Sequence, residues 1–403
     1  MNKMLKKVVL LMATITIMLS INAICFAGTG KPAKITEIKQ IDDSTSQVEL
    51  SFNKLGADYV SIEIDYGAGN GFEECVDKTS STERYISGLY AGKTYKVRLR
   101  GVNYIGSGNY SYGDYSDVFE VVTAPDKVQD LTQVDATETT AKLQWKASAG
   151  ATEYKITSDY SGNIVVGRST TNSFVVTKLD NDFTPGDYYV TAVKKSASGY
   201  VAESYKEGYY RTKVVPDAPD NLTISSSLWV DWSDPKNTEG YEVELYKTTS
   251  SKVYKKIDQS SSYLSLSSNG IINSKQFYKI RVRGYVTVNG AKKYSKWTGD
   301  LYFADELKMS IPTPKSAYSI KVKWTKMKGA KKYEVYASTS RNSGYKKVAT
   351  VKAKKSSYVI KKIKKKKINI RKNNYYIYVV AVGKFGGKKI KSKSGVWQVY
   401  SFL

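Results

Sequence analysis

Apolar and polar residues alternate in short runs along most of the chain, which is the pattern of half-buried β-strands. In one segment, Leu143 and Trp145 alternate with polar neighbours, an Ala/Gly-rich turn follows, and Tyr154 and Ile156 begin a second run. Successive side chains of a strand point to opposite faces, so this segment predicts two strands that each place one face in a core.

This unit recurs about every 90 residues. Trp145 and Tyr154 are nine positions apart, and the same separation occurs in Trp232 with Tyr241 and in Trp324 with Tyr333. The first copy is a variant, with Phe52 in the Trp position and Tyr59 seven positions later. The period exceeds the roughly 20–50 residues of solenoid repeats, so each copy is expected to be a separate domain with its own core.

A later alternating run completes each copy. Its members are Tyr95, Val97 and Leu99, then Tyr188, Val190 and Ala192, then Tyr278, Ile280 and Val282, and finally Tyr375, Ile377, Val379 and Ala381. In the fourth copy a register beginning at Tyr376 fits almost as well. A slip of one residue would turn the other face of that strand inward.

Prolines mark the expected boundaries between copies. The expected division is residues 1–27, 28–124, 125–215, 216–305 and 306–403, with Pro125, Pro216, Pro219 and Pro312 at the joins. Proline fixes its own φ, so the links are expected to restrict rotation. Strand-rich copies with turn signals every 8–12 residues or so predict an all-β fold of four tandem antiparallel sandwiches in an elongated array.

Each copy resembles a fibronectin type III module. The resemblance is carried by the second-strand Trp, the third-strand Tyr and a tyrosine-corner pattern, which is clearest as Leu89 with Tyr95 and Ile272 with Tyr278. It covers nearly all of the chain after residue 27, and the fourth copy resembles lysine-rich terminal modules of exported proteins from Gram-positive bacteria. The resemblance implies seven-stranded, immunoglobulin-like sandwiches used for adhesion, spacing or display, and it implies no chemistry.

Residues 1–27 are identified as a signal peptide. Lys3, Lys6 and Lys7 precede an apolar stretch, and small residues stand at the positions that a signal peptidase reads. Retention as a membrane anchor is the alternative, and lipid attachment at Cys25 is disfavoured by the large Ile24. No second apolar run of about 20 residues follows, so no membrane span is expected after signal removal, and a secreted, extracellular protein associated with the cell envelope is expected.

The composition argues against catalysis. The sequence has no histidine, which removes the commonest general base and metal ligand, and no cofactor or metal site is expected. Signal cleavage leaves Cys75 as the one cysteine, so no disulfide is expected and the thiol is interpreted as inert. Tyr accounts for 34 of the 403 residues, which favours strands over helices.

The first candidate site is the tyrosine-rich segment 104–115. It is expected to form the loop between the last two strands of the first copy, where sandwich folds often place binding residues. Tyr104, Tyr110, Tyr112 and Tyr115 are hypothesised to recognise a glycan or a protein, because Tyr supplies large rigid contacts beside small polar residues. The alternative is an ordinary solvated loop.

The second candidate site is a concentration of lysine. Residues 306–403 contain 27 Lys and Arg against two acids, a net charge of +25 in a chain whose total is +26. The densest run is Lys361, Lys362, Lys364, Lys365, Lys366 and Lys367. Lysine outnumbers arginine, which favours diffuse attraction to a polyanion over bidentate recognition. An anionic cell-wall polymer or another surface polyanion is the hypothesised partner, and a merely solubilising surface is the alternative.

Specific nucleic-acid binding is not expected, because strand alternation explains the tyrosines near the lysine run. The sequence therefore predicts a non-enzymatic, secreted or cell-surface array that acts as an adhesive or spacer, with a basic C-terminal module for electrostatic association. The alternative prediction is a non-catalytic carbohydrate-binding accessory of a secreted hydrolase system.

Overall fold

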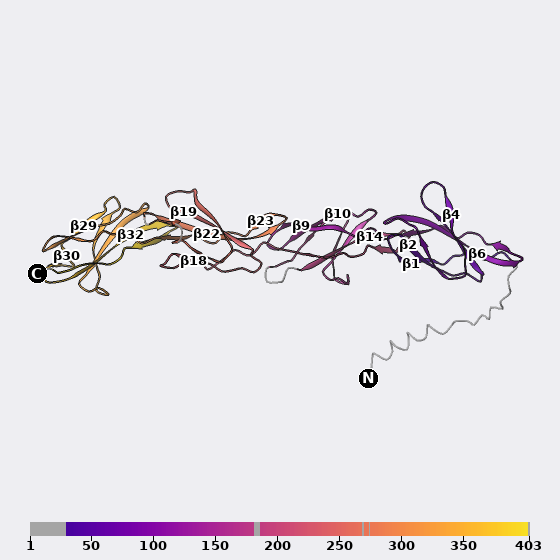
Figure 1. Cartoon of the computed structure of the whole chain (residues 1–403), viewed down its shortest axis with the longest axis horizontal. Helices are drawn as coiled ribbons and strands as arrows, with labels where there is room; N and C mark the ends of the chain where they lie inside the picture. The colour runs from indigo at the N-terminus through magenta and orange to yellow at the C-terminus, as the bar shows by residue number, and fades with distance from the viewer. Residues whose placement is uncertain (1–29, 181–185, 268–269, 274, 402–403) are drawn as a thin grey trace, which may run out of the picture.

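The chain forms a row of β-sandwiches along one long axis (Figure 1). The computed structural model describes residues 30–180, 186–267, 270–273 and 275–401, so the signal peptide expected in residues 1–27 lies outside the described residues. The described residues form 34 strands and no α-helix. The expected all-β array of four sandwiches is confirmed.

Each sandwich, called a module below, packs a three-stranded sheet against a five-stranded sheet. Module one has the sheet order β1-β2-β5, and its second sheet has the order β4-β3-β6-β7 with β8 also pairing to β6. Its strands are β1 (Ile38–Asp43), β2 (Gln47–Phe52), β3 (Tyr59–Asp65), β4 (Phe72–Thr79), β5 (Glu83–Ser87), β6 (Thr94–Gly106), β7 (Asn109–Tyr112) and β8 (Phe119–Val122).

Modules two and three repeat this order. In each of them the last two strands pair with the same neighbouring strand, as β7 and β8 both pair with β6 in module one. Module two comprises β9 (Gln129–Ala136), β10 (Ala141–Lys146), β11 (Glu153–Thr157), β12 (Val165–Ser169), β13 (Ser173–Val176), β14 (Asp187–Lys195), β15 (Val201–Glu203) and β16 (Tyr210–Arg211). Module three comprises β17 (Thr223–Ile224), β18 (Trp229–Asp231), β19 (Gly240–Lys247), β20 (Val253–Gln259), β21 (Tyr263–Ser265), β22 (Phe277–Val288), β23 (Ala291–Tyr294) and β24 (Leu301–Ala304).

Module four adds a small hairpin, β30-β31, to the same plan. Its strands are β25 (Thr313–Ser316), β26 (Ser319–Lys323), β27 (Ala330–Ser338), β28 (Lys346–Lys352), β29 (Ser357–Ile360), β30 (Lys362–Ile363), β31 (Lys366–Lys367), β32 (Tyr375–Phe385), β33 (Lys388–Lys393) and β34 (Trp397–Val399). The boundaries at residues 124, 215 and 305 stay predictions, and no described strand crosses them.

The repeated Trp and Tyr residues fill the cores of modules two to four. The three Trp rings are nearly buried, and each lies 5.1–5.4 Å from the Tyr ring of its own module. The Tyr hydroxyls reach the turn before their strand: the backbone N–H of Ser148 donates to Tyr154, and that of Met327 donates to Tyr333, both at 2.8 Å. The ring of this Tyr therefore fills the core, and its hydroxyl fixes the turn that precedes its strand.

Module one departs from the expected register. Val60, Ile62 and Ile64 of β3 are in the core with Phe52, whereas Tyr59 is on the outer face of the sheet. Tyr59, which stands seven positions after Phe52, therefore does not take the core position that the third-strand Tyr has in the other copies. The turn between Phe52 and β3 is shorter than in the other copies. Successive side chains of a strand point to opposite faces, so the shorter turn places Val60 in the core and Tyr59 on the outer face.

Two other expectations about strands are confirmed. The tyrosine corner is present, because the Tyr95 hydroxyl accepts from the Tyr90 N–H at 2.8 Å and the Tyr278 hydroxyl accepts from the Asn273 N–H at 2.9 Å. Module four has the same bond between Asn369 and Tyr375. In β32 the first of the two possible registers is correct, since Tyr375, Ile377, Val379 and Ala381 lie in the core.

Each module has its own main core cluster, and at one junction a residue of one module lies in the cluster of the next. Phe277 of module three is buried in the core cluster of module four, with its ring 5.2 Å from that of Phe385. Tyr302 of module three also stacks on Phe385, at 6.0 Å. Between modules two and three, a smaller apolar cluster contains Ala136, Val215, Val286 and Val288.

The junction between modules one and two is built differently. A Cβ added at Gly92 would lie 2.3 Å from the carbonyl oxygen of Ala149, and Gly150 faces Gly92 just as closely, so backbone packs on backbone. The Tyr200 hydroxyl donates to the Asp43 carboxylate at 2.7 Å across the junction. These contacts agree with links that restrict rotation.

Candidate functional sites

The four predicted tyrosines lie on one face of module one, three of them on strands and Tyr115 in the connection between β7 and β8. β6 and β7 join through a tight turn at Ser107 and Gly108, so Tyr104 is on β6 and Tyr110 and Tyr112 are on β7. The expected loop is therefore a long hairpin. Gly-Ser-Gly provides the tight turn, and the residues around it continue the ladder.

This surface, called the module-one aromatic face, consists of stacked rings and cations. Tyr104 and Tyr110 are opposite each other with ring centres 5.5 Å apart. The Arg100 guanidinium lies 4.3 Å from the centre of the Tyr112 ring and 4.7 Å from that of Tyr115. Arg98 lies 4.0 Å from the Tyr115 ring centre. The structure thus brings all four tyrosines together.

A carboxylate holds the centre of this face in place. Arg98 donates two hydrogen bonds to Glu63, at 2.6 and 2.9 Å, and the Tyr115 hydroxyl donates to the other carboxylate oxygen of Glu63. Burial alone would raise the pKa of Glu63, but the bonds from Tyr115 and Arg98 hold that pKa below its usual range. Tyr115 is therefore a structural residue as well as a candidate binding residue.

The same brace recurs in module three. Arg281 and Arg283 lie 4.1 and 4.4 Å from the Trp297 ring, and Arg283 also lies 3.7 Å from the Tyr294 ring. Arg283 pairs with Glu242 at 2.6 Å. The signal was visible in the sequence as Arg-x-Arg on one strand, followed by two aromatics three positions apart, the first at the end of the next strand and the second just after it. Recurrence of the brace favours a stabilising role for Tyr112 and Tyr115.

The end of the hairpin is the accessible part of the aromatic face. Tyr104 is 49% exposed and the neighbouring Ile105 is 46% exposed. Tyr110 is half-buried between Tyr104 and Tyr59, and the Lys78 ammonium lies 4.7 Å from its ring centre. Rings with open faces beside polar groups are suited to stacking against a sugar or a partner side chain.

The lysine run forms a second hairpin, called the lysine hairpin, which comprises Lys361–Lys367. Its two strands pair Lys362 with Lys367 and Ile363 with Lys366, and Lys364 in the turn has a φ of 53°. Ile363 packs on the module-four core, and the adjoining Ile368 is buried in it. All six predicted lysines are exposed.

The positive charge of this hairpin is uncompensated. The acids of module four, Glu306 and Glu334, pair with Lys308, Lys332 and Lys347. Within the described residues none of the six lysines forms an ion pair at 4.0 Å or less. Like charges on facing strand positions repel, so the hairpin has excess charge available for an external anion.

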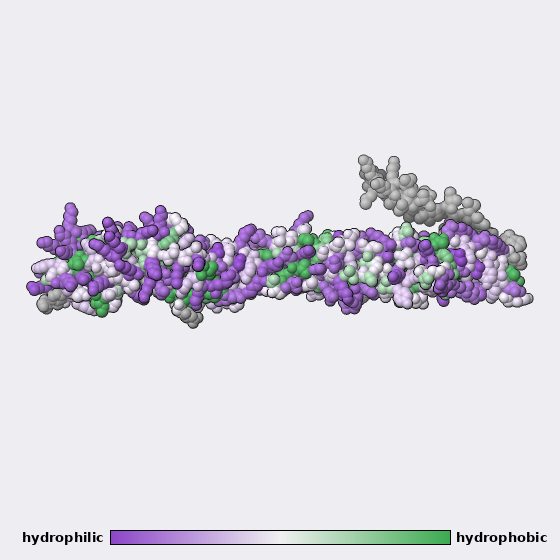
Figure 2. Space-filling view, turned by 90° about the horizontal axis from the view of Figure 1, so that it is seen from above, coloured by the Kyte–Doolittle hydropathy of each residue, from purple (hydrophilic) through white to green (hydrophobic). Residues whose placement is uncertain are grey.

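The two candidate sites lie at opposite ends of the molecule. Figure 1 places β6 at the end of the rod farthest from the C-terminus and β30 beside the C-terminus. In the space-filling view the C-terminal end is largely hydrophilic, with small apolar patches along the rod (Figure 2). The rod therefore presents an aromatic end and a cationic end.

A third surface was missed by the sequence analysis. Tyr160, Tyr205 and Tyr209 of module two are 58, 71 and 53% exposed. Tyr189 lies between two of them, 5.7 Å from Tyr160 and 5.8 Å from Tyr209. We call these four residues the module-two tyrosine cluster. The density of Tyr around residues 200–210 was its sequence signal.

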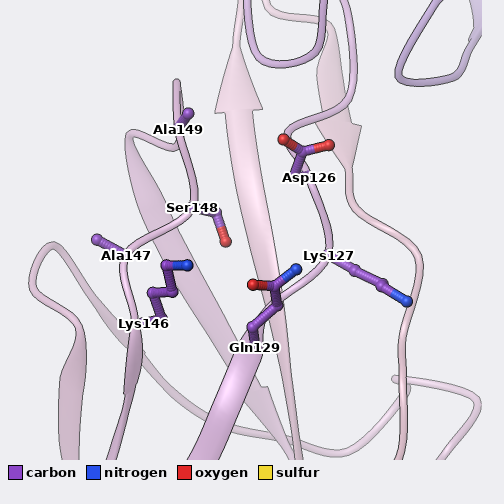
Figure 3. Close-up of a pocket in the computed structure, with 7 residues that line it drawn as sticks. All are labelled: Asp126, Lys127, Gln129, Lys146, Ala147, Ser148 and Ala149. Carbon is purple, nitrogen blue, oxygen red and sulfur yellow. The ribbon is translucent and has the colours of Figure 1, made fainter.

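A small polar cleft of about 300 Å³ lies at the junction of modules one and two. Figure 3 shows Ser148 and Gln129 directed toward its centre, and Lys127 directed away. Lys127 pairs instead with Glu207 at 2.6 Å. The cleft has one acid, Asp126, and its walls supply no arrangement for catalysis.

Cys75 is a partly buried, hydrogen-bonded thiol of module one. The Cys75 thiol is half-buried and donates to the Ile62 carbonyl, and burial raises its pKa to about 11, so it is protonated at neutral pH. In the described ranges no three Asp, Glu, His or Cys side chains come together as a metal site. The same ranges contain no helix long and apolar enough to cross a membrane.

Known proteins resemble parts of this chain at low sequence identity. No protein-family model matches the chain. Rat tenascin-R is 25% identical over 231 residues, which is 55% of this chain and 16% of tenascin-R, so the chain spans about a sixth of that relative.

Two solved structures are similar in fold. The FN1–FN3 domains of chicken CNTN1 cover 93% of this chain and all of their own at 11% identity, with a TM-score of 0.20. A segment of two fibronectin type III domains from chicken tenascin covers 44% of this chain and 99% of its own at 18% identity, with a TM-score of 0.26. The sheets of each described module form a sandwich of a three-stranded and a five-stranded sheet, which agrees with the fold that the sequence resemblance predicts.

Proposed function

We propose that the chain is a non-enzymatic spacer or adhesive rod, exported by a Gram-positive bacterium, whose basic module holds it on an anionic cell-wall polymer. The observation that carries the proposal is the placement of nearly all the excess charge in one end module, at the opposite end from the aromatic face. A rod held at its cationic end presents its aromatic end away from the surface.

Salt-dependent retention on purified cell walls tests this proposal. The full chain is expected to bind at low ionic strength and to elute steeply as sodium chloride rises, because screening weakens attraction between exposed charges. Replacing the six lysines of the hairpin by Gln is expected to lower the salt concentration needed for elution. Retention in molar salt, or equal elution of both proteins, would contradict an electrostatic hold.

Deletion of module four is a poor test. Phe277 of module three packs inside the module-four core, so removal of that module would expose an aromatic side chain and destabilise its neighbour. Charge-neutralised full-length variants avoid this, because the lysine side chains are exposed.

The second candidate function, a carbohydrate-binding accessory of a secreted hydrolase system, is favoured by the module-two tyrosine cluster. Exposed rings supply stacking surfaces that do not depend on salt. A pull-down on soluble polysaccharide in about 1 M salt separates the two functions, since charge attraction is largely screened there. The accessory function is supported if binding persists in this salt and is lost when Tyr160, Tyr205 and Tyr209 are replaced by Ala. As a control, replacing the half-exposed Tyr263 by Ala should leave binding unchanged.

A further inference from the structure

A groove of about 470 Å³ lies at the free end of module four, beside the lysine hairpin. One wall comes from the hairpin, with Lys364, Lys366 and Lys367. The opposite wall comes from the end of β27 and the start of β28, with Thr339 and Lys346. The groove therefore joins lysines that are far apart in the sequence, and Lys346 was not part of the predicted site.

The groove has a defined shape. The Ser338 hydroxyl donates to the Ser343 carbonyl at 2.6 Å and accepts from the Ser340 N–H at 3.0 Å, which fixes the turn that forms one wall. Ile363 and the buried Ile368 attach the other wall to the core. Both walls are therefore supported by packing and hydrogen bonds, whereas an ordinary charged surface has no such enclosure.

The chemistry of the lining selects an anion. Four lysines line the groove together with neutral donors and acceptors such as Thr339 and Asn373, and no Asp or Glu lines it. Lys364 has a positive φ, a conformation that costs energy for a residue with a side chain. Lysines that gather around a strained turn repel one another and destabilise the hairpin. An oxyanion bound among them offsets this repulsion.

We propose that this groove binds one oxyanion and the adjoining hydroxylated unit of a phosphodiester-linked polyol polymer. The inference rests on the proposed function, and it deepens that function from a diffuse hold to a discrete site. Nucleic acid is disfavoured as the occupant, because Tyr375 is the aromatic residue of the lining and its ring is buried, which leaves no stacking surface for a base.

The test compares two full-length variants of equal charge. The groove variant carries Lys346→Gln, Lys364→Gln, Lys366→Gln and Lys367→Gln. The control variant carries Lys315→Gln, Lys323→Gln, Lys352→Gln and Lys354→Gln, four exposed lysines of the same module that do not line the groove. A labelled glycerol-phosphate oligomer is titrated with each protein, and circular dichroism checks that each is folded.

The groove variant is expected to bind the oligomer about tenfold or more weaker than the unchanged chain, and the control variant within about threefold. Equal weakening of both would overturn the groove and leave the electrostatic function standing. No binding by the unchanged chain at low salt would overturn the function as well. A single-stranded oligonucleotide of equal phosphate number should bind more weakly; equal or tighter binding through the same four lysines would make nucleic acid the occupant and overturn the proposal.

Discussion

At the scale of single residues, a Trp–Tyr pair lies in the core of each of modules two to four. An edge-to-face aromatic pair stabilises a protein by about 0.5–1.5 kcal/mol beyond the burial of its area. In module three the pair is Trp232 with Tyr241, and the hydroxyl of that Tyr also donates to Asp234. Removal of the indole therefore leaves a cavity beside a hydrogen-bonded ring.

Module three offers a matched comparison for this effect. Trp232→Ala is expected to destabilise the chain by about 3–5 kcal/mol, because Trp232 is 6% exposed and its cavity cannot collapse. Trp229→Ala, three positions earlier and 45% exposed, should cost about 1 kcal/mol or less. Urea unfolding monitored by fluorescence checks both. Equal losses would mean that Trp232 is not a core residue.

Asp43 provides a pH-dependent contact at the first junction. Burial raises its pKa to about 6, although the hydrogen bond from Tyr200 opposes the rise, and the nearby Asp42 and Glu203 raise it further. The docked state then binds a proton more readily than the unfolded state. The contribution of Asp43 to stability is therefore fully present in acid and is lost as the pH rises through about 6.

Asp43→Asn removes this titration and keeps an oxygen that can accept from Tyr200. In the unchanged full chain, the first thermal transition is expected to shift downward by a few degrees between about pH 5 and pH 7.5, relative to that of the variant. Calorimetry of both proteins at the two pH values measures the difference. Identical shifts would exclude Asp43 as the titrating group.

At the scale of elements, the outer face of each long hairpin can combine bracing with display. The arginines of β6 and Tyr115, which follows β7, form the brace, whereas Tyr104 lies at the exposed end of the hairpin. Changing all four tyrosines together would confuse loss of binding with loss of stability. Single substitutions separate the two roles.

Tyr115→Ala should destabilise module one by about 1–2 kcal/mol, because it loses two cation–π contacts and the hydrogen bond to Glu63. Tyr104→Ser should change stability by about 0.5 kcal/mol or less and weaken adhesion if the aromatic face is used. Chemical denaturation and a surface-adhesion assay report the two effects. Loss of stability in the Tyr104 variant would contradict this division.

The strands were predictable because alternation and a three-fold repeated Trp–Tyr spacing report local geometry directly. The pattern left two registers open for β32, and the packing of the core decides between them. The short turn before Tyr59 was misread, because one residue of turn length reverses the face of the whole strand. Lys346 in the groove had no local signal, since the approach of β28 to β30 is a tertiary contact.

At the scale of the whole molecule, three dissimilar junctions connect the modules. Aromatic rings pack across the junction between modules three and four. The junction between modules two and three contains an apolar cluster with flanking ion pairs such as Lys293 with Asp135. The junction between modules one and two depends on closely packed glycines. Tight junctions keep the aromatic and cationic ends apart.

Gly92→Ala is expected to loosen the first junction, because the new Cβ would clash with the Ala149 carbonyl of module two. Gly56→Ala is the matched control, since Gly56 also has a positive φ but has open space around it. Small-angle scattering of the full-length proteins should show a broader distribution of interatomic distances for the Gly92 variant. Superimposable scattering curves would show that the contact between Gly92 and Ala149 does not set the angle between modules one and two.

The arrangement of junctions in series has a mechanical consequence. A pull applied between the two tips loads every junction with the same force, so the rod yields first where resistance is least. Across the first junction, within the described residues, no buried apolar cluster spans both modules, and short-range hydrogen bonds such as Tyr200 to Asp43 resist separation. Under tension, module one is therefore expected to separate from module two before the two junctions that share apolar packing give way.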